Sequence, residues 1–193
     1  MTPVPSVADQ RNRPLGVLRL SLTARCNLAC PYCCPDVADP PGLLSLEQQL
    51  RLIRVACRLG AHTLRLTGGE PLLSEQLLPL LIKVAQGRLT PGDPLEGLQQ
   101  VALTSNGVLL DHDRAHALRV AGLDRITISL DAVDGDVAAR MAGLRGGASA
   151  GERQVQRVLS GFEAARSAGF DPAAGALKPV SYTHLRAHET ESN

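Results

Sequence analysis

Four of the five cysteines in this 193-residue chain lie within nine residues, at Cys26, Cys30, Cys33 and Cys34. Three of them follow a C-x3-C-x2-C spacing, which places three thiolates on one tight loop. Thiolates are soft ligands that favour zinc, copper or iron–sulfur centres. A structural zinc site usually has two separated cysteine pairs, and no second pair follows here. Because Cys34 adjoins Cys33, their side chains diverge, so we expect the metal ligands to be Cys26, Cys30 and Cys33.

Cysteine usage and charge narrow the class of protein. An odd cysteine count and an N-terminus without the apolar segment of a secretory signal favour a reducing cytoplasm over a disulfide framework. The 20 Lys+Arg and 19 Asp+Glu leave a net charge of +1, which gives no electrostatic reason to expect nucleic acid or a membrane surface as partner. No apolar run approaches the ~18 residues of a membrane span. We therefore expect a cytoplasmic protein with neither partner, in which Cys57 is a core residue.

Short apolar strands alternate with amphipathic helices along the chain. Ser45 and Gln48 have the S-x-x-Q form of a capping box, which predicts a helix start. Alternation of strand and helix predicts parallel β/α units. We expect a partial TIM-type β/α barrel of roughly four units. The strands are expected at 17–22, 63–67, 100–104, 125–130 and from 176, and the helices from 45, at 74–86, 111–121 and 153–168.

Each of the first four expected strands is followed by polar or glycine-rich residues. The cysteine loop follows the first strand and Gly68–Pro71 the second, while Thr104–Gly107 closes the third and Ser129–Asp131 closes the fourth. In a β/α barrel the carboxyl ends of all strands face one rim, where active sites are built. The four segments therefore predict a single site, with Glu70 and Asp131 organising its rim.

The cysteine spacing, together with GGEP at residues 68–71, resembles the signature of the radical S-adenosylmethionine (SAM) superfamily. The resemblance implies a [4Fe–4S] cluster on the three cysteines, whose open iron binds the amino and carboxylate groups of SAM. Reduction of SAM then yields a 5′-deoxyadenosyl radical, so the cofactors carry the difficult chemistry. Taken singly, GG before Pro is an ordinary turn, and a loop tyrosine or strand-end serine is an ordinary packing residue. The SAM-binding residues implied are Tyr32, Gly68, Gly69, Glu70 and Ser129.

Within that superfamily, residues 17–178 are similar to the GTP 3′,8-cyclases of molybdenum cofactor biosynthesis. The similarity is carried by LRLS, CNLAC, YC and PD near the cysteines, LRLTGGEP at 64–71, TSNG at 104–107 and ISLD at 128–131. It implies that Arg19, Arg65, Thr104 and Lys178 contact GTP, and guanidinium geometry suits phosphate oxygens. The radical would remove the 3′ hydrogen of the GTP ribose, and the sugar radical would attack C8 to give 3′,8-cyclo-7,8-dihydro-GTP. An electron donor, and a homodimer for the full-length protein, are also implied.

The two ends of the chain differ from its middle. Residues 1–14 are expected to form a flexible arm, and residues 15–178 a truncated radical SAM core. Residues 180–190, VSYTHLRAHET, match without a break the conceptual translation of a transposase-type sequencing adapter. We therefore expect 179–193 to be a foreign tail, with a natural polar tail as the alternative, and we exclude His184 and His188 as ligands.

Two departures from the cyclase pattern bear on activity. The loops at 93–97 and 134–151 look longer than usual. The family's second cluster needs three more cysteines near the C-terminus, which these 193 residues lack. We expect the chain to hold one cluster and not to turn over.

Two other functions fit parts of the pattern. A different radical SAM enzyme, such as a 7-carboxy-7-deazaguanine synthase or a peptide maturase, would share the cysteines and GGEP without needing Arg19 and Arg65. A small zinc-binding module would share only the cysteines. A reconstituted iron–sulfur protein is brown whereas a zinc protein is colourless.

Overall fold

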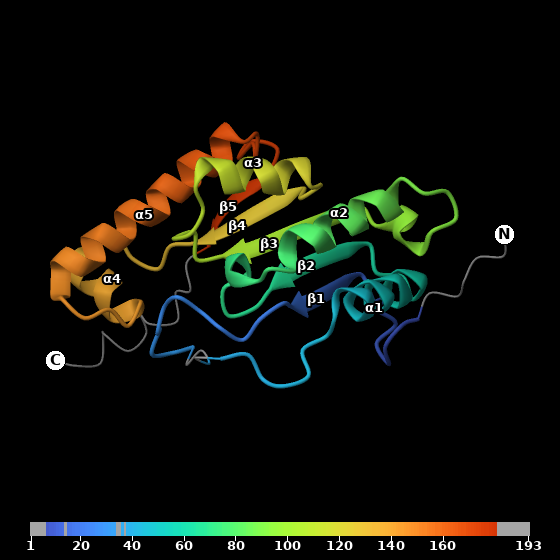
Figure 1. Cartoon of the computed structure of the whole chain (residues 1–193), viewed down its shortest axis with the longest axis horizontal. Coiled ribbons are helices and arrows are strands. Elements are labelled where there is room, and N and C mark those ends of the chain that lie inside the picture. Colours follow the sequence, from blue (N-terminus) through green and yellow to red (C-terminus); the bar gives the residue numbers. More distant parts are fainter. Residues whose placement is uncertain (1–6, 14, 34–35, 37, 181–193) are drawn as a thin grey trace.

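Five parallel strands form one sheet in the order β1-β2-β3-β4-β5 (Figure 1). The computed structural model describes residues 7–13, 15–33, 36 and 38–180. Successive strands are neighbours, as expected when each strand is followed by a crossover helix. This confirms the prediction of an α/β fold with an incomplete barrel of β/α units. The strands are β1 (Val17–Ser21), β2 (Thr63–Thr67), β3 (Gln100–Ser105), β4 (Arg125–Ser129) and β5 (Leu177–Val180).

Helices cover one face of this sheet (Figure 1). Along β2 and β4 alternate residues are buried, among them Leu64, Leu66, Ile126 and Ile128, and they join the helices in one hydrophobic core. The intervening residues of these strands point to the opposite face, because side chains alternate along a strand. The helical elements are α1 (Leu46–Arg58), α2 (Leu77–Arg88), α3 (His112–Val120), α4 (Gly135–Met141) and α5 (Gly147–Ser167), with 3-10 turns η1 (Pro71–Leu73) and η2 (Pro94–Gly97).

The capping box predicted at the first helix is present. The Ser45 hydroxyl accepts a hydrogen bond from Gln48 N at 3.3 Å, and the Gln48 side chain accepts one from Ser45 N at 2.8 Å. Leu50 and Ile53 of α1 are buried, and the half-buried Cys57 packs against the same core, as predicted. Local capping and helical spacing were therefore sufficient to place α1.

The segment expected to be a long glycine-rich loop at 134–151 is largely helical, so that prediction was wrong. Asp134 caps α4 by accepting a hydrogen bond from Val137 N at 2.9 Å, and α5 begins at Gly147 rather than at 153. Gly135 and Gly151 allow the two helices to pack closely, because a Cβ on Gly151 would overlap the Gly135 carbonyl oxygen. Glycines that normally signal a loop here serve helix packing.

Smaller differences concern element ends. Helix α2 begins at Leu77, after η1, rather than at 74. The expected loop at 93–97 contains η2, which Asp93 caps. Strand β5 continues to Val180, two residues past the expected end of the native core. The remainder of the expected tail, half of the N-terminal arm and Cys34 lie outside the described residues, so the domain boundaries stay predictions.

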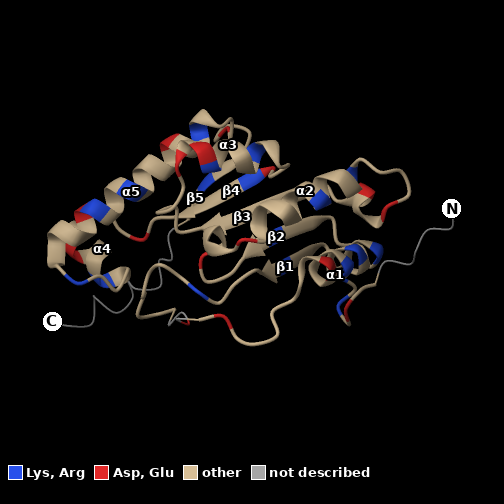
Figure 2. Ribbon diagram, viewed as in Figure 1, with Lys and Arg blue, Asp and Glu red and all other residues tan. Residues whose placement is uncertain are grey.

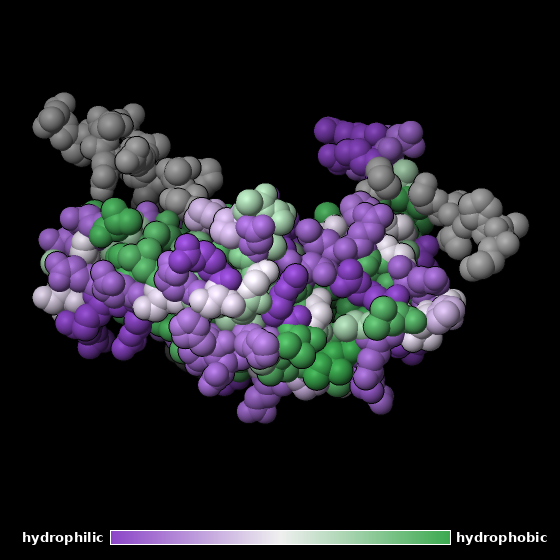
Figure 3. Space-filling view, turned by 90° about the horizontal axis from the view of Figure 1, so that it is seen from above, coloured by the Kyte–Doolittle hydropathy of each residue, from purple (hydrophilic) through white to green (hydrophobic). Residues whose placement is uncertain are grey.

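The surface of the molecule combines acidic, basic and hydrophobic residues. Figure 2 shows acidic and basic residues interspersed along α1, α3 and α5. Seen from above in Figure 3, the surface is mostly hydrophilic, with hydrophobic patches between. Within residues 7–180, as far as they are described, no helix combines the length and apolar character needed to cross a bilayer.

Candidate functional site

A cavity of about 540 Å³ opens at the carboxyl ends of the strands. The cysteine loop forms one wall, and the ends of β2, β3 and β4 form its floor. Of the twelve predicted site residues, nine line this cavity, which confirms that the four rim segments meet. The nine are Arg19, Cys26, Cys30, Tyr32, Cys33, Gly68, Gly69, Thr104 and Ser129.

The three candidate ligand cysteines are free thiols on the cavity wall. Cys26 and Cys30 are half-buried, whereas Cys33 is exposed. Burial raises the pKa of the Cys26 and Cys30 thiols, and nearby acidic groups, Glu70 for Cys26 and Asp131 for Cys30, raise it further. A metal binding there would have to displace these protons, since thiolate is the ligating form.

A hydrogen bond ties the cysteine loop to the far side of the rim. The Tyr32 hydroxyl donates to Asp131 Oδ2 at 2.7 Å, across 99 residues of sequence. Burial raises the pKa of Tyr32, and the bond to Asp131 raises it further, so the phenol remains a donor at neutral pH. The loop thus reaches from β1 to the end of β4.

The GGEP segment supports the base of the cysteine loop. Gly69 N donates to Thr23 O at 2.7 Å, and Glu70 N donates to Arg25 O at 2.8 Å. A Cβ on Gly69 would overlap the carbonyl oxygen of Arg25, so only glycine allows this approach. Gly69, which the resemblance predicts to bind SAM, thus makes a close approach to the chain's own backbone.

Glu70 lies beneath the rim and does not line the cavity. Its side chain is 1% exposed, and its carboxylate accepts hydrogen bonds from the Ser105 hydroxyl, Asn106 N and Leu72 N at 2.8, 2.8 and 3.0 Å. Burial raises the pKa of Glu70, while these donors counteract the rise. The carboxylate joins the loops that follow β2 and β3, which agrees with the expected organising role.

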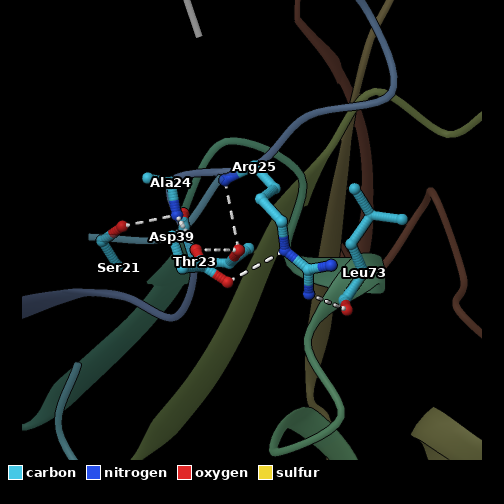
Figure 4. A network of polar contacts seen from close by, with 6 residues as sticks. All are labelled: Ser21, Thr23, Ala24, Arg25, Asp39 and Leu73. Atoms are coloured by element: carbon cyan, nitrogen blue, oxygen red, sulfur yellow. Dashed lines mark hydrogen bonds and ion pairs between the residues drawn. The ribbon is translucent and has the colours of Figure 1, made fainter. Parts of the chain in front are cut away.

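A second carboxylate closes the cysteine loop (Figure 4). Asp39 accepts hydrogen bonds from the Thr23 hydroxyl at 2.6 Å and Ala24 N at 2.7 Å, and it pairs with Arg25 Nε at 2.9 Å. The Arg25 guanidinium also donates to Leu73 O at 3.4 Å. Residues before and after the three cysteines are thereby joined, although no sequence pattern singled out Asp39.

The four predicted GTP contacts share one sheet face but lie at different depths. Arg19 and Thr104 line the cavity. Arg65 is the register partner of Arg19, and Lys178 is the partner of Thr127 on β4. Neither Arg65 nor Lys178 lines the cavity, and both side chains are exposed.

The family model described as "Radical SAM superfamily" matches residues 20–183. The chain belongs to the radical SAM superfamily. Among solved structures, native anSMEcpe with bound AdoMet has a TM-score of 0.61 at 18% identity, over 87% of this chain and 43% of that one. Streptococcus suis SuiB bound to S-adenosylmethionine has a TM-score of 0.57 at 20% identity, over 78% and 32%. At these identities the likeness concerns the fold alone.

Sequence relatives of this radical SAM chain are more similar. It is 72% identical over 178 residues to a protein named GTP 3′,8-cyclase from Parasynechococcus marenigrum (strain WH8102), covering 92% of this chain and 51% of the relative. A protein of the same name from Xanthomonas campestris pv. campestris (strain B100) is 42% identical over 170 residues, covering 84% and 45%. The chain spans about half the length of the curated relatives it matches.

The residues present in this radical SAM chain fit the cofactors expected of the family. Among the described residues, no three Cys, His, Asp or Glu side chains converge on a point that would hold one metal ion. A [4Fe–4S] cluster needs no such convergence, because each thiolate binds a different iron. Three free thiols on one loop, beside backbone amides and a serine, make a suitable donor set.

Cavity residues from α4 and α5 were missed by sequence reasoning. Met141 and Gln154 both line the cavity, and Gln154 is only 9% exposed. Because the sequence pattern predicts a loop at 134–151, it does not predict the part of this wall that α4 forms. The Asp134 cap three residues before Val137 was the signal that could have revealed α4.

Proposed function

We propose that the chain forms the cluster- and SAM-binding part of a GTP 3′,8-cyclase, the first enzyme of molybdenum cofactor biosynthesis. That reaction converts GTP to (8S)-3′,8-cyclo-7,8-dihydroguanosine 5′-triphosphate. The 72% identity to a GTP 3′,8-cyclase over 178 residues carries the proposal. The cavity supports it, because candidate cluster ligands and candidate substrate contacts open into the same space.

In this proposal Cys26, Cys30 and Cys33 hold a [4Fe–4S] cluster, while Gly68, Gly69, Tyr32 and Ser129 surround SAM. When bound, these cofactors supply the radical that removes the 3′ hydrogen of GTP. Arg19 and Thr104 hold the substrate from the sheet floor of the cavity. Its remaining wall is largely apolar, with Ala138, Met141, Val155 and Val158 limiting the access of water.

The chain's own residues also keep the cysteine loop in place before any cofactor binds. Glu70, Asp39 and Asp131 each anchor a different part of the loop or rim through hydrogen bonds of 2.6 to 3.0 Å. Such support is expected around a metal site, because neighbouring hydrogen bonds orient the ligands.

We propose further that the 193-residue chain holds one cluster and does not complete turnover. It contains no cysteine beyond Cys57 with which to build the family's second cluster. In the longer protein, three more cysteines would complete that site. An external electron donor, a cytoplasmic location and a homodimer of the longer protein belong to the same proposal.

Anaerobic reconstitution tests the cluster. We expect a brown protein with four irons per chain, and the triple substitution of Cys26, Cys30 and Cys33 by Ala should abolish iron binding. Cys57→Ala is the matched control and should keep the iron. A colourless protein containing one zinc would replace the proposal with a zinc module.

Ligand binding tests the substrate. Substituting Arg19 and Arg65 together by Ala should leave reductive SAM cleavage intact and abolish GTP binding. If GTP binding is unchanged while SAM is still cleaved, the chain is a radical SAM protein of another specificity.

A further inference from the structure

Three arginines lie in one row across the sheet. Arg19 on β1 is the register partner of Arg65 on β2, which pairs with Ala102 on β3, which in turn pairs with Arg125 on β4. Register partners point to the same face, and here that face is the one away from the helices. The small Ala102 side chain separates Arg65 from Arg125. We call Arg19, Arg65 and Arg125 the arginine row.

The described strand residues on this face of the sheet carry positive charges and no carboxylate. Alternate positions of β1 to β5 on this side contribute the arginine row and Lys178, and neither Asp nor Glu occurs in any of the five strands. Several arginines elsewhere in the described part of the chain do have carboxylate partners. Arg25, Arg54 and Arg88 contact Asp39, Asp93 and Asp124 at 2.9, 2.9 and 3.0 Å.

Within the arginine row, Arg125 has a buried donor, its Nε, that lacks a hydrogen-bond acceptor among the described residues. Burial lowers the pKa of Arg125, and the positive charge of Arg65 lowers it further, which indicates that the two cations are electrostatically coupled. A buried donor without an acceptor costs free energy, and like charges add to that cost. An anion that binds between Arg65 and Arg125 removes both costs.

We propose that Arg125 is a phosphate-binding residue that clamps a polyphosphate chain together with Arg65. This inference rests on the proposed function, in which the anion is the triphosphate of GTP. Two guanidinium forks on either side of Ala102 can each offer parallel N–H donors to phosphate oxygens. Nothing in the family resemblance pointed to Arg125.

The strand register also determines where along the strands the anion would lie. Arg65 and Arg125 lie two residues before Thr67 and Thr127 on their strands. At ~3.3 Å per residue, the two arginines are about 7 Å farther along the strands from the cysteine loop than these threonines. The triphosphate would therefore extend along the sheet away from the cysteine loop, which leaves the ribose nearer the cluster. Arg19 spans the two regions, since it belongs to the row and also lines the cavity.

Calorimetry with the reconstituted 193-residue chain tests the clamp, using inorganic tripolyphosphate and GTP as separate probes. Arg125→Ala should weaken tripolyphosphate binding about tenfold or more, in line with the loss of a charged hydrogen bond. Arg125→Lys should bind with intermediate affinity, since it keeps the charge and loses the fork. Arg51→Ala, an exposed charge on α1, is the matched control and should bind like the unsubstituted chain.

The outcomes separate the clamp from the proposed function. If Arg125→Ala binds both probes normally while the Arg19 and Arg65 variant loses GTP, the clamp is wrong and the cyclase proposal stands. If tripolyphosphate binding depends on Arg125 but GTP binds no better than inorganic tripolyphosphate, the clamp stands and the cyclase proposal fails. If Arg125→Ala and Arg125→Lys lower the melting temperature without changing either affinity, Arg125 is a structural residue and the clamp is overturned.

Discussion

The two faces of the sheet use adjacent residues for different purposes. Toward the helices, Leu64, Leu66, Ile126 and Ile128 are fully buried in one hydrophobic core. On the opposite face, Arg65, Thr104 and Ser129 leave polar groups directed at the cavity or at solvent. Within each strand, residues that stabilise the core therefore alternate with residues that can bind a ligand. Substitutions of two adjacent residues in a strand should have unrelated effects.

The largest expected effect is on the buried face. Leu66→Ala should lower the free energy of unfolding by about 2–5 kcal/mol, because it leaves a cavity in a fully buried position. Its neighbour Arg65→Ala should change that free energy by no more than about 0.5 kcal/mol while weakening GTP binding. Urea unfolding and calorimetry measure the two quantities, and equal stability losses in the two variants would contradict the division between faces.

A glycine at the rim tests how the cysteine loop depends on the sheet. Gly69→Ala should destabilise the chain by about 1–3 kcal/mol through overpacking against Arg25 and Ala24, and should reduce iron incorporation. Gly97→Ala is the control, because a Cβ there meets nothing within 4 Å. Iron content and thermal melts would report both effects, and normal iron incorporation in Gly69→Ala would show that the loop does not need this contact.

The Tyr32–Asp131 bond links the cysteine loop to β4. Tyr32→Phe should cost about 0.5–1.5 kcal/mol, the net value of one hydrogen bond, and should weaken SAM binding several-fold. Equilibrium dialysis with SAM measures the second effect. Unchanged stability together with unchanged SAM affinity would mean that the loop is held without this bond.

The smallest effect on stability is expected when an ion pair in the helix layer is broken. There Arg54 of α1 pairs with Asp93 beside η2. The hydrogen bond from Arg54 holds the pKa of Asp93 below its ordinary value of 3.8. A lowered folded-state pKa stabilises the fold above about pH 4 and loses that contribution as the pH falls through the folded value.

Asp93→Asn should therefore cost no more than about 1 kcal/mol at pH 7, because the pair is partly exposed. The difference from the unsubstituted chain should shrink as the pH falls below 4. Melting curves at several pH values measure it, and a difference independent of pH would rule out the ion pair as its source.

Much of the candidate site could be predicted from sequence because its parts follow strands. The cysteine loop, the GGEP segment and Ser129 each come directly after an apolar run, and parallel strands bring such segments to one rim. Residues whose role depends on distant partners could not be found in this way. Asp39, Gln154 and Arg125 stand in no local pattern that marks them, and α4 was hidden by the glycines around it.

The sequence by itself determined the order of the five strands, the capped start of α1, the clustering of the rim segments and the resemblance to radical SAM proteins. These properties depend on local spacing and on the alternation of side chains along strands. Only the tertiary structure decided that Glu70 lies beneath the rim, that Asp39 closes the cysteine loop and that Arg125 shares a row with Arg19 and Arg65. Those facts depend on strand register and on burial between segments far apart in sequence, which local patterns do not encode.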